Sequence, residues 1–129
     1  MTSGQQAPSV VLLLLLTGFD FYLCSHHPNL AVLDLSDNHI SAISGVFSLR
    51  LLACLNLDHN VISSVDGIPP LPVKELGLAC NEISSLGGLS GCVHVEVLRI
   101  GSNGIGSLAG LESMKALRVR DETAKWFKK

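Results

Sequence analysis

The side chains that could bind a metal or catalyse a reaction are few and scattered. Cys24, His26 and His27 lie close together, and His59 and Cys80 are 21 residues apart, but neither group supplies the four ligands of a structural zinc site. The serine, histidine and aspartate residues show no nucleophile elbow, and no glycine-rich stretch has the spacing of a phosphate-binding loop. We therefore expect no enzyme activity, no bound metal and no cofactor.

The chain instead repeats an asparagine at intervals of 22, 21 and 22 residues. The repeated residues are Asn38, Asn60, Asn81 and Asn103. Leucine, isoleucine or valine stands three, five and eight residues before each one and two, five and eight residues after it. Glycine stands seven residues after each one, as Gly45, Gly67, Gly88 and Gly110. Four copies in phase indicate a repeat protein, in which each unit buries its apolar edge against the next.

Each part of the repeat predicts a local structure. The Leu-x-Leu pair points alternate side chains to one face, as in a short strand. The asparagine amide carries donors and an acceptor, so we expect it to satisfy backbone groups at a buried bend. The apolar spacing of three after the bend predicts a helical or 3₁₀ return segment, and the glycine lets that segment bend where a Cβ would interfere.

The pattern Leu-x-x-Leu-x-Leu-x-x-Asn-x-Ile-x-x-Ile-x-Gly-Leu resembles the leucine-rich repeat, in its short class of about 22 residues. The resemblance covers residues 30–114. It implies an α/β solenoid: a right-handed coil with a short parallel sheet on the concave face and 3₁₀ or helical turns on the convex face. It also implies protein binding. The short class includes the leucine-rich regulatory subunit of protein phosphatase 1 and axonemal dynein light chains. The implied partner is therefore a phosphatase catalytic subunit, a dynein heavy chain or another axonemal component.

Two terminal regions flank the four repeats. Residues 1–29 are hydrophobic and fit a degenerate capping repeat, although the apolar run at 10–16 also allows a signal peptide cleaved after Ser25. Residues 115–129 contain an incomplete fifth repeat and a basic tail, in which Trp126 and Phe127 are placed to fold over the end of the stack. Two alternatives stay open: a secreted or cell-surface recognition module, and a truncated product without independent function.

Composition excludes several other classes of protein. Of the 129 residues, 47% are hydrophobic and 16% charged, which is too apolar for a disordered chain. The net charge of −2 argues against a dedicated nucleic-acid binder, and no apolar run reaches the roughly 18 residues of a membrane span. The four cysteines lack the spacing of paired disulfide cysteines, which favours the cytoplasm over secretion. A ciliary or axonemal location is the more specific form of this expectation.

Binding is expected on the side chains that point outward from the strands. Two such positions, four and two residues before the asparagine, change from acidic to basic along the chain. The first holds Asp34, Asn56, Gly77, Arg99 and Arg118, and the second holds Ser36, Asp58, Ala79, Gly101 and Arg120. This gradient suits an extended peptide or helix with the opposite order of charges. The candidate contacts are Asp34, Asn56, Asp58, His59, Glu75, Arg99, Arg118 and Arg120.

Overall fold

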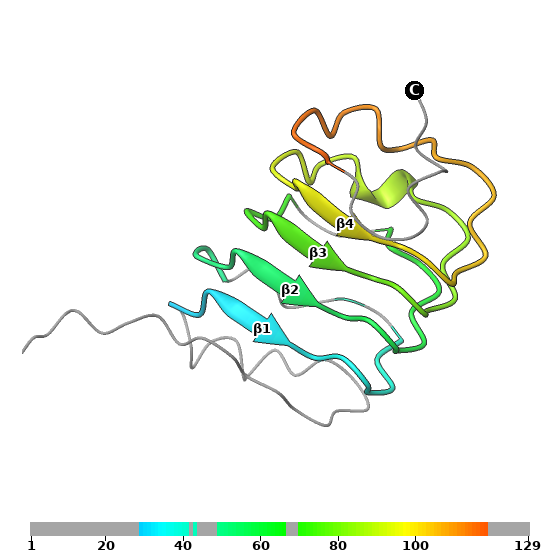
Figure 1. Cartoon of the computed structure of the whole chain (residues 1–129), viewed down its shortest axis with the longest axis horizontal. Helices are drawn as coiled ribbons and strands as arrows, with labels where there is room; N and C mark the ends of the chain where they lie inside the picture. Colours follow the sequence, from blue (N-terminus) through cyan, green and yellow to red (C-terminus); the bar gives the residue numbers. More distant parts are fainter. Residues whose placement is uncertain (1–28, 42, 44–48, 67–69, 119–129) are drawn as a thin grey trace, which may run out of the picture.

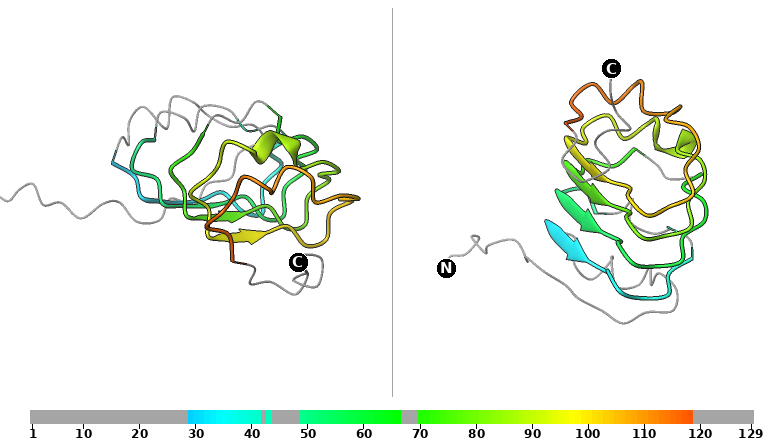
Figure 2. Two further views of the ribbon diagram at one scale, coloured as in Figure 1. Left: turned by 90° about the horizontal axis from the view of Figure 1, so that it is seen from above. Right: turned by 45° about the vertical axis from the view of Figure 1, so that its right-hand side comes forward.

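Four short strands stack in the order of the chain, each from one turn of a coil (Figure 1). The computed structural model describes residues 29–41, 43, 49–66 and 70–118. The strands are β1 (Val32–Asp34), β2 (Cys54–Asn56), β3 (Glu75–Gly77) and β4 (Val97–Arg99). They pair in parallel. Return segments run on the opposite side of the coil, where the 3₁₀ helix η3 (Gly87–Leu89) lies (Figure 2). The predicted solenoid with a parallel sheet is confirmed.

The phase of the sequence repeat becomes the register of the sheet. The central leucines of the four strands are partners across it: Leu33, Leu55, Leu76 and Leu98. Each is buried, while the first residue of every strand is only partly buried. Because neighbouring side chains of a strand point to opposite faces, the leucines face the core and the flanking residues face the concave surface.

The core is aliphatic and continues through all four coils. Among the described residues, the leucines, isoleucines and valines at the repeat positions of the first three coils are buried, except Ile43, which is partly buried. Cys92 is 0% exposed and occupies a further core position, eleven residues after the asparagine, which it shares with Leu49, Leu71 and Met114. Burying one such side chain contributes about 1.5–3 kcal/mol, so repetition replaces the aromatic residues of a conventional core.

The asparagine amides form a ladder between neighbouring coils. In Asn60, Nδ2 donates to the Leu57 carbonyl of its own coil and to the Leu35 carbonyl of the preceding coil, at 3.0 Å each. Its Oδ1 accepts the Ile40 N–H of the preceding coil at 3.0 Å. Asn81 and Asn103 repeat these contacts. The amides therefore bond backbone groups at the bend of their own coil, and each also joins two coils.

At the described glycines of the repeat, the preceding coil lies too close to leave room for a Cβ. A Cβ on Gly88 would collide with the Val65 carbonyl group, whose carbon would lie at 2.5 Å. A Cβ on Gly110 would lie 2.5 Å from the Leu86 oxygen, and Gly110 also has a φ of +107°, which favours glycine. Gly45 and Gly67 lie outside the described residues.

The residue before each asparagine has a left-handed backbone conformation. These residues are Asp37, His59, Cys80 and Ser102, with φ of 58°, 58°, 59° and 58°. Such angles are uncommon outside glycine, although aspartate and histidine adopt them more readily than most residues. The strand therefore ends in a sharp bend that directs the asparagine inward.

The two terminal regions are described only at their inner edges. Residues 1–28, predicted as a cap or signal peptide, and residues 119–129, which include most of the fifth repeat, lie outside the described residues. Within the described part, no helix is long and apolar enough to cross a membrane.

Candidate functional site

An ion cluster at the centre of the concave face connects three coils. Arg99 of β4 donates from Nε to Asp58 Oδ2 at 3.1 Å and from Nη1 to Glu75 Oε2 at 2.7 Å. The other Asp58 oxygen, Oδ1, accepts the backbone N–H of Ala79 at 2.8 Å. Three predicted contact residues therefore lie together. The guanidinium of Arg99 pairs with both carboxylates, and the cluster of one cation and two anions carries a net charge of −1.

Gly77 of β3 provides the space through which the cluster passes. A Cβ at this position would lie 2.7 Å from Asp58 Oδ1 and would collide with the Arg99 guanidinium. The sequence analysis placed Gly77 among the outward residues without assigning it this role. The repeat alignment could have indicated this role, because Gly77 lies between the longer residues Asn56 and Arg99 in the sheet register.

Charges in the cluster shift the pKa values of Arg99 itself and of the neighbouring Cys54. Burial alone would lower the pKa of Arg99, but hydrogen bonds and attraction from Glu75 and Asp58 outweigh it and raise this pKa. The pKa of the Cys54 thiol is raised chiefly by burial and secondly by the Glu75 carboxylate. Cys54 is partly buried beside Glu75 in the sheet register. At neutral pH the site therefore contains a fixed cation and a protonated, uncharged thiol.

Polar groups near the first strands are held by their own strand ends. Asp34 Oδ1 accepts the Ser36 hydroxyl at 2.6 Å and the Ser36 N–H at 3.0 Å. Asn56 Oδ1 accepts the Asp58 N–H at 3.0 Å. Both side chains are partly buried, and their positions are fixed by local hydrogen bonds. This end of the face presents an ordered carboxylate and amide.

The position of Arg118 differs from its alignment in the sequence. The alignment placed Arg118 beside Arg99, but the sheet pairs Arg118 with Val97, and the Arg118 N–H donates to the Glu96 carbonyl at 2.6 Å. That placement is wrong because the fifth coil lacks the asparagine that fixes the phase of the others. The Arg118 side chain instead pairs with Glu96, Nη2 to Oε1, at 3.3 Å. Arg120 lies outside the described residues.

The remaining candidates do not form a metal site in the described part of the chain. His59 is exposed at its left-handed bend, and Cys80 is partly buried at the equivalent bend of the next coil. No group of three or more histidine, cysteine, aspartate or glutamate side chains suited to a metal ion occurs among the described residues.

Comparisons with known proteins agree with this geometry. Residues 26–45 match the family described as Leucine Rich repeat. Internalin C2 of Listeria monocytogenes superposes with a TM-score of 0.67 and 24% identity, over 75% of this chain and 44% of that one. This chain has the fold of a leucine-rich-repeat solenoid. The leucine-rich-repeat fold is shared by a protein of Leptospira interrogans, with a TM-score of 0.64 and 19% identity, over 80% of this chain and 28% of that one.

A third solved structure, TLR13 in its complex with ssRNA13, has a TM-score of 0.61 and 20% identity, over 84% of this chain and 20% of that one. The present chain thus spans less than half the length of each of the three structures. A search of curated proteins finds no match. The comparisons indicate no catalytic family, and leucine-rich-repeat solenoids are in general binding modules that use their concave surface.

Proposed function

We propose that this chain is a non-enzymatic protein-binding module that contacts its partner through the concave face of β1–β4. The observation that carries the proposal is the register of the sheet, which aligns outward residues of successive strands on one face. Among the described elements, no helix or strand packs over that face. A row of aligned, partly exposed side chains is the kind of surface that repeat proteins use for extended contacts.

The chemistry of the face suits an extended segment of another protein. The first outward position of the strands is largely apolar, with Val32, Cys54 and Val97, and the next carries polar or charged groups. The charge that the face offers a partner is mainly negative, because the cluster of Arg99, Asp58 and Glu75 keeps a net charge of −1 and Asp34 adds a carboxylate, whereas Arg118 is paired with Glu96. A partner segment would place an apolar side and a few charges against this surface.

The finer proposals concern the partner and the compartment. We propose a scaffold or regulatory subunit in the cytoplasm, with a ciliary or axonemal location as the more specific form. The candidate partners are a phosphatase catalytic subunit, a dynein heavy chain or another axonemal component. These proposals are supported by the resemblance of the repeat pattern to the short class of leucine-rich repeats.

Charge reversal on the concave face tests the proposed binding surface. The test variant carries Asp34→Arg and Arg118→Asp, and the matched control carries Glu82→Arg and Arg50→Asp, two exposed residues of the return segments. Both variants keep the net charge. Tagged full-length chains are expressed in the native cell type, and captured proteins are quantified by mass spectrometry. We expect a partner that is retained by the wild type and the control but lost by the test variant.

The same experiment identifies the outcome that contradicts the proposal. If the test variant and the control retain the same proteins in equal amounts, the concave face is not the binding surface. Circular dichroism spectra of both variants must match the wild type, so that lost binding is not a consequence of unfolding. Intact mass and cell fractionation test the compartment: a full-length chain in the cytosol or cilium supports it, and a chain shortened by about 25 residues in the medium contradicts it.

A further inference from the structure

The two arginines that the structure describes on the concave face are already paired within the protein. Arg99 pairs with Asp58 and Glu75, and Arg118 pairs with Glu96. The change from acidic to basic side chains along the sequence is therefore not the charge that a partner meets. At the basic end of the face, the positive charge is largely neutralised before any partner arrives.

The carboxylates at the other end of the face are not neutralised. Asp34 uses one oxygen, Oδ1, to accept the N–H and the hydroxyl of Ser36. Its other oxygen, Oδ2, has no hydrogen-bond or ion-pair partner among the described residues, and neither has the exposed carboxylate of Asp37. On this face, the unpaired charges of the first two coils in the described part are thus both negative.

Asn56 adds a hydrogen-bond donor beside Asp34. Its Oδ1 accepts the Asp58 N–H at 3.0 Å, and this bond fixes the orientation of the amide. Its Nδ2 donates to no described residue. Asp34 and Asn56 are partners in the sheet register, on neighbouring strands that lie about 4.8 Å apart. A carboxylate oxygen and an amide N–H, each without a partner in the described part, therefore lie side by side at the ends of β1 and β2.

An apolar surface lies on the same face, two residues before this pair in each strand. It is formed by Val32 and Cys54, which are also register partners and are both partly buried. The Cys54 thiol is uncharged at neutral pH, because burial raises its pKa. Two residues of a strand span about 6.6 Å, which is within reach of the apolar stem of a lysine or arginine side chain.

We propose that the β1–β2 half of the concave face binds a lysine or arginine side chain of a partner protein. The stem of that side chain packs on Val32 and Cys54, and its charged head binds the Oδ2 atom of Asp34. The Nδ2 group of Asn56 donates to a backbone carbonyl of the same segment. This inference rests on the proposed function and names the chemistry of the partner: a basic segment that needs no acidic residue over β4.

The sign of the charge selects the class of partner. Nucleic acids and anionic lipid surfaces present phosphates, which Asp34 and Asp37 repel. Lys74, which is exposed just before β3, repels a basic side chain over the third coil. The basic residue of the partner is therefore directed to the first two strands.

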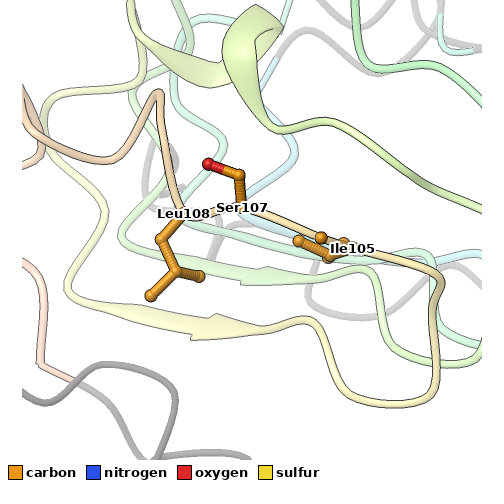
Figure 3. A pocket seen from close by; sticks show the side chains of 4 residues that line it. Ile105, Ser107 and Leu108 are labelled. Carbon is orange, nitrogen blue, oxygen red and sulfur yellow. The ribbon is translucent and has the colours of Figure 1, made fainter.

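The pocket at the last described return segment does not compete for such a residue. It has a volume of about 350 Å³ and is lined by Ile105, Gly106, Ser107 and Leu108, none of which is charged. Figure 3 shows the labelled side chains on this segment, which lies outside the four strands. A basic probe has no counter-ion among the residues of this pocket.

Peptide binding to the full-length chain tests the proposal. The probe is a fluorescein-labelled peptide of alternating leucine and arginine, and its counterpart carries glutamate in place of arginine. Fluorescence anisotropy should show binding of the arginine peptide and at least about tenfold weaker binding of the glutamate peptide. Asp34→Asn keeps an acceptor for Ser36 and should weaken binding of the arginine peptide by about threefold or more. The matched control is Asp66→Asn, which removes one carboxylate from an exposed residue of a return segment and should change the affinity by less than about twofold.

A third variant separates this proposal from binding along a charge gradient. Arg99→Gln frees the carboxylates of Asp58 and Glu75, so it should tighten binding of the arginine peptide. Weaker binding in Arg99→Gln overturns the proposal, as do equal affinities for the two peptides or equal effects of Asp34→Asn and Asp66→Asn. Circular dichroism must show that all three variants keep the fold of the wild type.

The outcomes also distinguish this inference from the proposed function. If the capture experiment finds a protein that depends on the concave face but the peptide results fail, the binding function stands and the basic partner is wrong. If the arginine peptide binds at Asp34 but no captured protein depends on the concave face, the peptide site stands and the proposed function is contradicted.

Discussion

Arg99 forms an ion pair with Asp58, which lies two coils earlier in the solenoid, at an Nε–Oδ2 distance of 3.1 Å. The two side chains are 26% and 17% exposed. In a solenoid nearly all contacts join neighbouring coils, so stability is close to a sum of coil and nearest-neighbour contributions. This pair adds a link between coils that are not neighbours, and it passes over Gly77 to do so.

We predict measurable coupling between Arg99 and Asp58. A double-mutant cycle with Arg99→Gln and Asp58→Asn should give an interaction free energy of about 0.5–1 kcal/mol, because both side chains are partly shielded from water. The measurement is urea unfolding at low and high salt, and the coupling should fall with salt. The exposed pair of Arg118 and Glu96 is the control and should couple by close to zero. Equal coupling in both pairs would contradict the interpretation.

Two glycines should respond very differently to alanine. In Gly77→Ala the new Cβ meets the ends of the Arg99 and Asp58 side chains, which can move away, so the free energy of unfolding should change by less than about 1 kcal/mol. In Gly88→Ala it meets the Val65 backbone, which is fixed by packing, and the loss should be about 1–3 kcal/mol or more. Denaturant melts compare the two. A larger loss at Gly77 would mean that the cluster, not coil spacing, limits stability.

The asparagine ladder predicts a large effect of Asn60→Ala. The substitution leaves the Ile40 N–H without its acceptor, at about 1–3 kcal/mol for an unsatisfied buried group. It also removes one of the two amide donors to the Leu35 carbonyl, which still accepts from Asn38. Asn60→Asp keeps an acceptor but loses the donors, so it should also be destabilising. The control Ser63→Ala changes an exposed residue and should stay within about 0.5 kcal/mol of the wild type. An unaltered melting midpoint for Asn60→Ala would contradict the ladder.

Cys54 should show a shifted pH dependence of alkylation. Its thiol pKa is raised by burial and by Glu75, so reaction with iodoacetamide should reach its midpoint at a higher pH than in an exposed cysteine. Glu75→Gln removes a negative charge and should lower that midpoint, whereas Arg99→Gln should raise it further. Peptide-resolved mass spectrometry separates Cys54 from Cys92, which is 0% exposed and should react slowly throughout.

The same shift has a defined sign for stability. A pKa raised in the folded state means that the folded protein holds the proton more tightly than the unfolded chain does. The contribution of Cys54 is therefore fully present below the pKa of an unfolded cysteine and is lost as the pH rises through the folded value. Cys54→Ser should flatten the alkaline part of the stability profile, and an unchanged profile would show that the thiol titrates normally.

Features that depend on the repeat period were predictable from the sequence. The leucines of the strands and the asparagines recur in phase, and each one needs only its own coil and the next to define its role. The ion pair of Arg99 and Asp58 was not predicted as a pair. Its partners lie 41 residues apart in the sequence, and the contact depends on the length of an arginine side chain and on free space above Gly77.

Two other features could not be found from the pattern. The residues before the asparagines have a left-handed backbone conformation but differ in type. The sequence therefore gives no sign of this conformation at Asp37 or Ser102. The fifth coil was misaligned by two residues, with Arg118 placed beside Arg99, because no asparagine fixes the phase there. Val97 therefore pairs with Arg118 in the sheet, where the alignment had placed Arg99.

The direction of the asparagine ladder has a consequence for folding during synthesis. Each amide completes the backbone hydrogen bonds of the coil before it, as Asn81 does for the N–H of Ile62 and the carbonyl of Leu57. A nascent coil therefore stays incomplete until the next asparagine leaves the ribosome. Synthesis from the N-terminus delivers these residues in the required order. Folding should accordingly follow translation with a delay of one coil, and a stalled chain from which Asn60 but not Asn81 has left the ribosome should have a second coil that is still open.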